Sequence, residues 1–374
     1  MRISSAPAAA QSVNPKIALV VGTRPEIIKL AVLSKLLGER AYLIHTGQHF
    51  DDNLSAAFFA TFGLTPPQLC LDGVGGASRA QQFSLITGEL GRHFAERRPD
   101  AVVVQGDTNT AAAAAQAAHF AGIPVVHVEA GLRSNDRAMP EEINRILIGV
   151  VADHHCAPTE ESAANLRLAG VDPRRVTVTG NTVVEATLEC LPGPQDTEAV
   201  LSAHGVQAGH YALATIHRPE NTDDPRRLDA ILTELAKLPV PVVFSTHPRT
   251  RAAATRHGLS AALDRLGPVE PVGYRDFLAL AQGAMLLISD SGGIQEECTV
   301  LKKPLIVVRN STERPEAVEA GFAERVQPGP AISRAASRLL ADTGLHARLA
   351  ATPSPYGDGL ASQRIVAILS QFTR

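Results

Sequence analysis

Short runs of apolar residues alternate with amphipathic stretches along the first half of the chain. Lys16–Val21 and Ala41–His45 are nearly continuous apolar runs of strand length. The segment between them places apolar side chains about one helical turn apart, at Ile27, Leu30, Leu33 and Leu37. Strands that are apolar on both faces and are joined by amphipathic helices are typical of a parallel sheet with helices on both sides.

The same alternation continues to the end of the first half. Further strands are expected at Ala101–Val104, Pro124–Val128, Ala152–Pro158 and Val176–Val178. Further helices are expected at Phe50–Phe62, Arg79–Arg97, Ala111–Ala121, Glu141–Val151 and Thr159–Gly170. Gly63–Ser78 is rich in Pro and Gly and is expected to be a loop. About six strands alternating with helices predict an α/β fold with a doubly wound parallel sheet and right-handed crossovers.

The pattern is interrupted at Cys190–Thr197, which contains two prolines and a glycine and is interpreted as a linker. The alternation then restarts and predicts a second α/β domain. Its strands are expected at Tyr211–Ile216, Val240–Ser245, Val269–Pro271, Ala284–Ser289 and Pro304–Val308. Because 374 residues exceed what one core comfortably holds, two domains are expected. Their predicted bounds are a tail over 1–15, a first domain over 16–189, a linker over 190–198 and a second domain over 199–355.

Composition narrows the class of protein. No run approaches the roughly 18 apolar residues of a membrane span, and the first 15 residues lack the pattern of a signal peptide. A net charge of -3 without a basic cluster, together with 4% aromatic residues, disfavours nucleic acid as a partner. The four cysteines are scattered, which predicts free thiols in a reducing cytoplasm and no structural zinc.

Ionisable residues follow two neighbouring apolar runs of the first domain. Asp107 comes shortly after Ala101–Val104, and Glu129 ends the next run. Ligands of parallel sheets bind outside the carboxyl ends of the strands, so both acids are expected on one rim. Glu141 follows at the start of a predicted helix, with Arg145 one turn beyond it. Three carboxylates that converge on one rim indicate a site of chemistry. Arg145 is expected either to hold Glu141 ionised or to form an ordinary surface pair.

Two further segments suggest sites for anions. Arg24 and Lys29 lie at or near a predicted helix start, where cations and backbone N–H groups together favour an anion, although solvated surface charges would give the same pattern. In the second domain, Ser291, Gly292 and Gly293 form a strand-to-helix turn whose backbone suits a diphosphate. Glu296 or Glu297, one turn further, is placed to reach ribose hydroxyls. Such a turn also occurs without any ligand.

Histidines give a weaker signal. His217 ends the first strand of the second domain and is a candidate acid, base or diphosphate donor, although a packed structural histidine is equally compatible. His154 and His155 are adjacent on a predicted strand and therefore face opposite sides, which disfavours a shared metal ion. Neither a dinucleotide fingerprint nor a P-loop is present, and the sequence indicates no metal site and no cofactor.

Several short blocks, spread from residue 17 to about residue 365, occur together in one order. They are Gly22–Glu26, Gln105–Thr108, His127–Ser134, Pro140–Arg145, Thr179–Thr182, His217-Arg218, Asp290–Glu297 and Thr312–Glu316. As a set they resemble the non-hydrolysing UDP-N-acetylglucosamine 2-epimerases. The resemblance implies a GT-B fold, with two Rossmann-like domains, the active site between them, and a C-terminal helix within 356–374 that crosses back to the first domain.

The resemblance also implies a reaction. UDP is eliminated to give 2-acetamidoglucal and then adds back, so that UDP-N-acetylglucosamine and UDP-N-acetylmannosamine interconvert. It assigns Asp107, Glu129 and Glu141 to proton transfer and His217 to stabilisation of the diphosphate. It assigns substrate binding to Arg24, Lys29, Arg145, Phe277, Ser291, Gly292, Gly293, Glu297 and Arg314. It implies a homodimer that needs no cofactor and no metal. Which carboxylate removes the proton stays open.

Other functions remain compatible with the same residues. A hydrolysing epimerase would release free N-acetylmannosamine, and a related epimerase would act on a modified UDP-sugar such as a diacetamido uronic acid. A GT-B glycosyltransferase would have no reason for three acids in the first domain. A silent nucleotide-sugar binding protein would have no need to keep them.

Many bacterial members of the family are activated by UDP-N-acetylglucosamine in a second pocket, through a loop that resembles Gln-His-Arg. Here Gln48 and His49 match that loop, but Phe50 replaces the cation and Asp51 adds a negative charge. A carboxylate repels a diphosphate and a phenyl ring cannot bind one. The sequence therefore predicts a weakened regulatory site, unless Arg79 or Arg137 supplies the missing charge.

Overall fold

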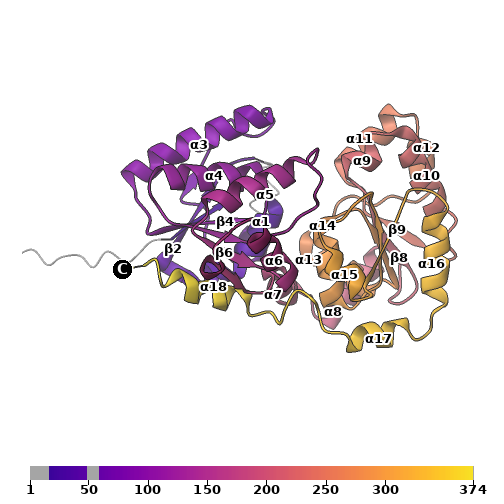
Figure 1. Cartoon of the computed structure of the whole chain (residues 1–374). Helices are drawn as coiled ribbons and strands as arrows, with labels where there is room; N and C mark the ends of the chain where they lie inside the picture. Colours follow the sequence, from indigo (N-terminus) through magenta and orange to yellow (C-terminus); the bar gives the residue numbers. More distant parts are fainter. Residues whose placement is uncertain (1–16, 49–58, 374) are drawn as a thin grey trace, which may run out of the picture.

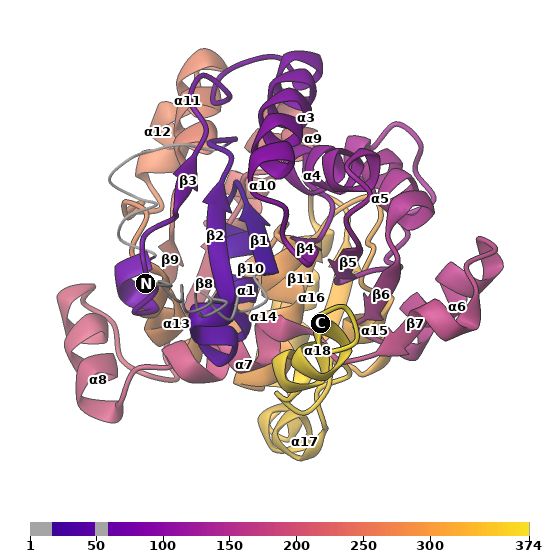
Figure 2. The same cartoon turned by 90° about the vertical axis from the view of Figure 1, so that its left-hand side faces the viewer.

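The computed structural model describes residues 17–48 and 59–373, and these form two α/β domains, each built on a parallel sheet (Figure 1). The first sheet has seven strands in the order β3-β2-β1-β4-β5-β6-β7, and Figure 2 shows them side by side. The strands are β1 (Ile17–Val21), β2 (Ala41–His45), β3 (Leu69–Cys70), β4 (Ala101–Gln105), β5 (Val125–Val128), β6 (His154–Ala157) and β7 (Val176–Val178). The predicted fold class is confirmed.

Helices cover both faces of this sheet because its strands are apolar on both sides. Val102 and Val104 of β4 pack with α3 and α4, whereas Ala101 and Val103 pack with α1 and α18. The helices of this domain are α1 (Arg24–Leu37), α3 (Arg79–Glu96), α4 (Asn109–Phe120), α5 (Pro140–Val151), α6 (Glu160–Leu168) and α7 (Thr182–Cys190). The alanines of α4 are almost entirely buried, as its small residues predicted.

The second sheet has five strands in the order β12-β11-β10-β8-β9. They are β8 (Ala212–Thr215), β9 (Val242–Phe244), β10 (Leu286–Ser289), β11 (Leu305–Val308) and β12 (Ala323–Val326). The helices around them are α8 (Pro194–Ala203), α9 (Pro219–Thr222), α10 (Pro225–Leu235), α11 (Pro248–Arg256), α12 (Ser260–Asp264), α13 (Tyr274–Gly283), α14 (Gly292–Leu301), α15 (Pro315–Glu319), α16 (Ala331–Ala341) and α17 (Leu345–Ala351).

The chain returns to the first domain at its end. Helix α18 (Ala361–Leu369) lies beneath that domain in Figure 1 and packs on α1, with Ile365, Ile368 and Leu369 in the same core. Of the segment interpreted as a linker, only residues 191–193 lie outside helices, because α7 ends at Cys190 and α8 begins at Pro194. No helix of the described residues has the length and apolar character to cross a membrane.

Three strands differ from those expected. The expected loop Gly63–Ser78 contains β3, which pairs with β2 at the sheet edge through two residues. The expected strand Val269–Pro271 is reduced to one bridge, between Ser245 and Val269. Strand β12 was not expected. Its central residues are Glu324 and Arg325, and an edge strand with charged residues at its centre does not show the apolar run by which strands are predicted.

Candidate active site

The first loop of the site joins β1 to α1 and is built around a buried carboxylate. Glu26 accepts hydrogen bonds from the N–H groups of Gly22 (2.9 Å) and Thr23 (2.7 Å) and from the hydroxyl of Thr108 (2.7 Å). Burial raises the pKa of Glu26 to about 7 against these donors. A side chain at Gly22 would collide with its neighbours, since a Cβ atom there would lie 2.1 Å from a threonine hydroxyl. The loop therefore fixes the start of α1, where Arg24 stands.

Asp107 follows β4 and is held by α5. Its carboxylate accepts from Nε of Arg145 at 2.8 Å, and its backbone oxygen accepts from Asn144 at 2.9 Å. Arg145 also pairs with Glu142, at 2.6 Å. The prediction that Arg145 holds Glu141 is therefore wrong, because the guanidinium turns to Asp107 and to the other acid of the motif. Glu141 lies half-buried at the start of α5 and makes no hydrogen bond or ion pair within residues 17–48 and 59–373.

Glu129 follows β5 in a left-handed backbone conformation, with φ 64°, which is uncommon for a residue with a side chain. Its carboxylate is buried and ion-paired with Lys29 of α1. It also accepts from Gln105 at 2.9 Å and from Nη2 of Arg314 at 3.2 Å. Lys29 is therefore a partner of a candidate catalytic acid in this structure. Its predicted contact with the substrate stays a prediction.

A second buried acid, Glu296 of α14, completes a network between the domains. It pairs with Lys29 at 2.8 Å and with Nε of Arg314 at 2.6 Å, and it accepts from Asn181 at 3.1 Å. Burial by itself would raise the pKa of Glu296, but Arg314 and Lys29 outweigh burial and lower it. Burial, followed by the charge of Glu296, raises the pKa of Glu129. The two acids thus have pKa values displaced in opposite directions.

Arg314 is the centre of this network rather than an exposed cation. Its guanidinium is shared among Glu129, Glu296 and Glu313. It lies directly beneath the start of α14, because a Cβ atom added to Gly292 would stand 2.6 Å from its Nη1. A larger residue at that position would have to displace this guanidinium. The predicted contact of Arg314 with a sugar nucleotide is not tested by these pairings.

His217 is oriented by a fully buried carboxylate. Asp290 accepts from the backbone N–H groups of His217 (3.0 Å) and Arg218 (2.9 Å) and from Asn221 (3.0 Å). It also faces Nδ1 of His217 at 3.3 Å. Burial lowers the pKa of His217 although Asp290 opposes the shift. An anion near Nε2 would favour the protonated ring, so that the histidine can serve a diphosphate.

The turn Ser291–Gly293 opens α14 as predicted, with Ser291 as its N-cap. Glu297 lies one turn further and is almost buried. It accepts a hydrogen bond from the hydroxyl of Tyr274 at 2.9 Å, and burial raises its pKa to about 7. Phe277 stands on α13, half-buried against the core of the second domain. The turn and these two side chains come from neighbouring parts of one domain.

Of the two residues expected at a regulatory site, the structure describes Gln48. Its side-chain oxygen accepts from the N–H (2.8 Å) and the hydroxyl (2.9 Å) of Thr110, so it fastens the end of β2 to the start of α4. His49 lies outside the described residues, as do Phe50 and Asp51. The predicted weakening of the regulatory site stays a prediction.

Several members of the site were not assigned from the sequence. No sequence pattern marks any of these residues individually as functional, but each belongs to a block of the resemblance. They are Gln105, Asn181, Asp290 and Glu313. Among the described residues no group of three His, Cys, Asp or Glu side chains could hold a metal ion.

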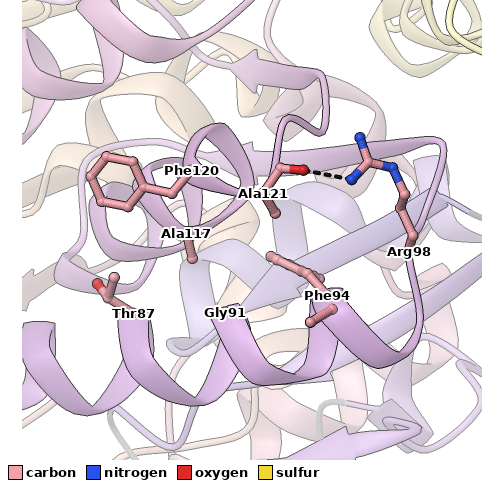
Figure 3. A pocket seen from close by; sticks show the side chains of 8 residues that line it. Thr87, Gly91, Phe94, Arg98, Ala117, Phe120 and Ala121 are labelled. Carbon is pink, nitrogen blue, oxygen red and sulfur yellow. Dashed lines mark hydrogen bonds between the residues drawn. The ribbon is translucent and has the colours of Figure 1, made fainter.

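A separate pocket of about 450 Å³ lies between α3 and α4 (Figure 3). It is lined by Thr87, Gly91, Phe94, Ala95, Arg98, Ala117, Phe120 and Ala121 and contains none of the predicted site residues.

Comparisons with known proteins show which family the chain resembles. The sequence profile of UDP-N-acetylglucosamine 2-epimerase matches residues 35–370. A UDP-N-acetylglucosamine 2-epimerase of Methanocaldococcus jannaschii is 37% identical over 95% of this chain and 99% of its own. A UDP-2,3-diacetamido-2,3-dideoxy-D-glucuronate 2-epimerase of Pseudomonas aeruginosa is 36% identical over 95% of this chain and 99% of its own.

The fold is shared as well. A crystal structure of the Methanocaldococcus jannaschii enzyme in complex with UDP-GlcNAc and UDP aligns with a TM-score of 0.86, covering 95% of this chain and 99% of that one at 37% identity. Similarity of this extent, in sequence and in structure, shows a shared family and a shared fold. The chain belongs to the UDP-N-acetylglucosamine 2-epimerase family.

Proposed function

We propose that the protein interconverts UDP-N-acetylglucosamine and UDP-N-acetylmannosamine without hydrolysis, for the synthesis of cell-surface polysaccharide or amino sugars. The observation that carries the proposal is the buried network in which Glu129 of one domain meets Lys29, Arg314 and Glu296. It lies beside the α14 turn, where a diphosphate would bind. The relative from Methanocaldococcus jannaschii was crystallised with UDP-GlcNAc and UDP, which supports the nucleotide sugar as ligand.

The reaction needs two opposite proton transfers. A base takes the proton from carbon 2, the bond between carbon 1 and the diphosphate oxygen breaks with its electron pair, and UDP and 2-acetamidoglucal remain bound. UDP then adds back while an acid protonates carbon 2 on the other face. Asp107, Glu129 and Glu141 form the proposed proton-transfer set. Glu129 suits it best in its environment, since its pKa is raised by burial.

The departing UDP gathers negative charge, and the groups proposed to receive it come from both domains. Arg24 contributes from the start of α1, and His217 contributes from the second domain with Asp290 behind its ring. The free N–H groups at the start of α14 point to the same anion. Retention of UDP by these groups is what would allow re-addition in place of hydrolysis.

A modified UDP-sugar is the second candidate substrate. The relative named for UDP-2,3-diacetamido-2,3-dideoxy-D-glucuronate is almost as similar to this chain as the Methanocaldococcus jannaschii enzyme, at 36% against 37% identity. A carboxylate on the sugar would need a cation near carbon 5. Comparing turnover of the two UDP-sugars under the same conditions distinguishes the candidates.

We further propose a cytoplasmic homodimer. All four cysteines are free thiols, as expected in a reducing compartment. Two large apolar side chains, Phe120 and Val150, are about three-quarters exposed on the outer helices of the first domain, at 75% and 74%. Exposed apolar side chains of this size are common where a second subunit packs. Sedimentation of the purified protein measures the state directly.

The reaction is tested by incubating the protein with UDP-N-acetylglucosamine in deuterated water and following the products by NMR. We expect UDP-N-acetylmannosamine, and deuterium at carbon 2 of both epimers, because elimination exchanges that proton with solvent. Free N-acetylmannosamine and UDP would instead show a hydrolysing enzyme. Epimerisation without deuterium would contradict the elimination route.

A further inference from the structure

Tyr274, the first residue of α13, contacts the carboxylate expected to bind the ribose. Its hydroxyl donates to Oε1 of Glu297 at 2.9 Å, and both side chains are nearly buried, at 9% and 8% exposure. A phenol that donates to a carboxylate fixes both the rotamer of the acid and the oxygen that remains available. The pairing joins α13 to the helix that begins with the proposed diphosphate turn.

The other side of Tyr274 faces the first domain. The phenol oxygen lies 3.4 Å from the hydroxyl of Thr187 in α7, which must donate because the phenol proton is given to Glu297. The ring stacks on Phe62, with centroids 6.1 Å apart and planes inclined by 29°. Figure 1 shows α13 and α14 on the side of the second domain that faces α7. Tyr274 is thus clamped between the two domains.

Glu297 keeps one oxygen for a ligand. Within residues 17–48 and 59–373, the one hydrogen bond that the Glu297 side chain accepts is the one from Tyr274 to Oε1, which leaves Oε2 for another donor. Glu297 and Gly293 are four residues apart in α14 and share one face of the helix. A nucleotide whose diphosphate lies at the start of the helix would therefore extend its ribose along this face towards Oε2.

The groups around Glu297 shift its pKa in opposite directions. Burial raises its pKa to about 7 and the adjacent Glu296 acts in the same direction, while Tyr274 and Lys29 act against them. The phenol therefore helps to keep the carboxylate in its ionised form, which is the stronger acceptor for hydroxyl donors.

We infer that Tyr274 is a positioning residue for nucleotide recognition, which holds the Glu297 carboxylate ready for the ribose hydroxyls and ties that contact to the packing of the two domains. The inference rests on the proposed function, because it takes the ligand to be a uridine nucleotide. In this arrangement Tyr274 does not itself contact the ligand and acts through Glu297. Its effect should therefore appear only with ligands that carry the hydroxyls.

The test compares binding of UDP and of 2′,3′-dideoxy-UDP by calorimetry. The unmodified protein should prefer UDP by at least tenfold, because a site built to bind a hydroxyl leaves a polar group unpaired with the analogue. In Tyr274→Phe we expect UDP affinity to fall about tenfold, within the range for hydrogen bonds to charged groups. Affinity for the dideoxy analogue should change less than about twofold. Glu297→Gln should reduce the same preference, and combining it with Tyr274→Phe should add little more.

Tyr211→Phe is the matched control, because its buried hydroxyl also donates to α13, at the backbone oxygen of Leu280, without touching Glu297. It should leave the preference for UDP intact. Equal losses for UDP and the analogue in Tyr274→Phe, or the same loss of preference in Tyr211→Phe, would overturn the inference and point to a general packing defect. If the unmodified protein binds UDP and the analogue equally, Glu297 does not read the ribose and the inference fails while epimerisation stays open. Failure to bind UDP at all would overturn both.

Discussion

The carboxylates of the site differ in what surrounds them. Asp107 is partly exposed, with 28% of its side chain accessible, and is paired with Arg145. Glu129 is buried among Lys29, Gln105 and Arg314, and burial raises its pKa. Epimerisation by elimination needs one group that takes a proton and another that returns it. Carboxylates in such different environments are suited to divide these roles.

We expect Asp107→Asn, Glu129→Gln and Glu141→Gln each to lower the turnover of UDP-N-acetylglucosamine by roughly 100-fold or more, which is the usual scale of general acid–base catalysis. Each replacement keeps the shape of the side chain and removes its titrating group. Thermal unfolding followed by circular dichroism should show that each variant still folds.

Glu89→Gln on α3 is the control for these acids, since its ion pair with Arg92 lies on the surface and should not affect turnover. A variant of the three acids that keeps near-normal activity removes that residue from the proton-transfer set. The prediction for Glu141 has the least structural support of the three, because the structure shows no ion pair or hydrogen bond for this side chain among the described residues.

At the scale of elements, periodicity predicted what was long and apolar. The alternation of apolar strands with helices predicted both sheets, and the run of alanines predicted a helix packed against its neighbours. Edge strands were missed because they lack that signal: β3 has two residues, and β12 carries Glu324 and Arg325 at its centre. Within the interpreted linker, Pro194 opens helix α8.

The close packing of α4 predicts a cost for any added volume. Ala113 is fully buried in the core shared by α3, α4 and the first sheet. Ala113→Leu should therefore lower the free energy of unfolding by about 1–3 kcal/mol, measured in urea. Ala80→Leu on the exposed side of α3 should change it by less than about 0.5 kcal/mol. Equal stability of both variants would show that α4 can shift to admit the larger side chain.

At the scale of the molecule, the sequence pointed to candidate ionisable residues but not to the residues that they contact. The sequence predicts that Lys29 contributes to an anion site for the substrate. In the structure Lys29 pairs with Glu129, a hundred positions away, and with Glu296 of the other domain. Spacing in the chain cannot predict such pairings, because they depend on how the two domains pack. Thr159 makes a further contact across the domains, donating to Glu316 at 2.6 Å.

This buried network should govern how the domains move on binding UDP. The groups proposed to hold the nucleotide are divided between the domains, so UDP should draw them together and lower the radius of gyration measured by small-angle X-ray scattering.

Arg314→Met would leave Glu129, Glu296 and Glu313 without their shared cation. Breaking a buried ion pair on one side is strongly destabilising, so this variant should be more expanded without UDP and compact less with it. Arg338→Met, which breaks an exposed pair with Glu324, should behave as the unmodified protein does. An unchanged radius of gyration at saturating UDP in the unmodified protein would contradict closure, and an Arg314→Met variant that compacts normally would show that the network does not control it.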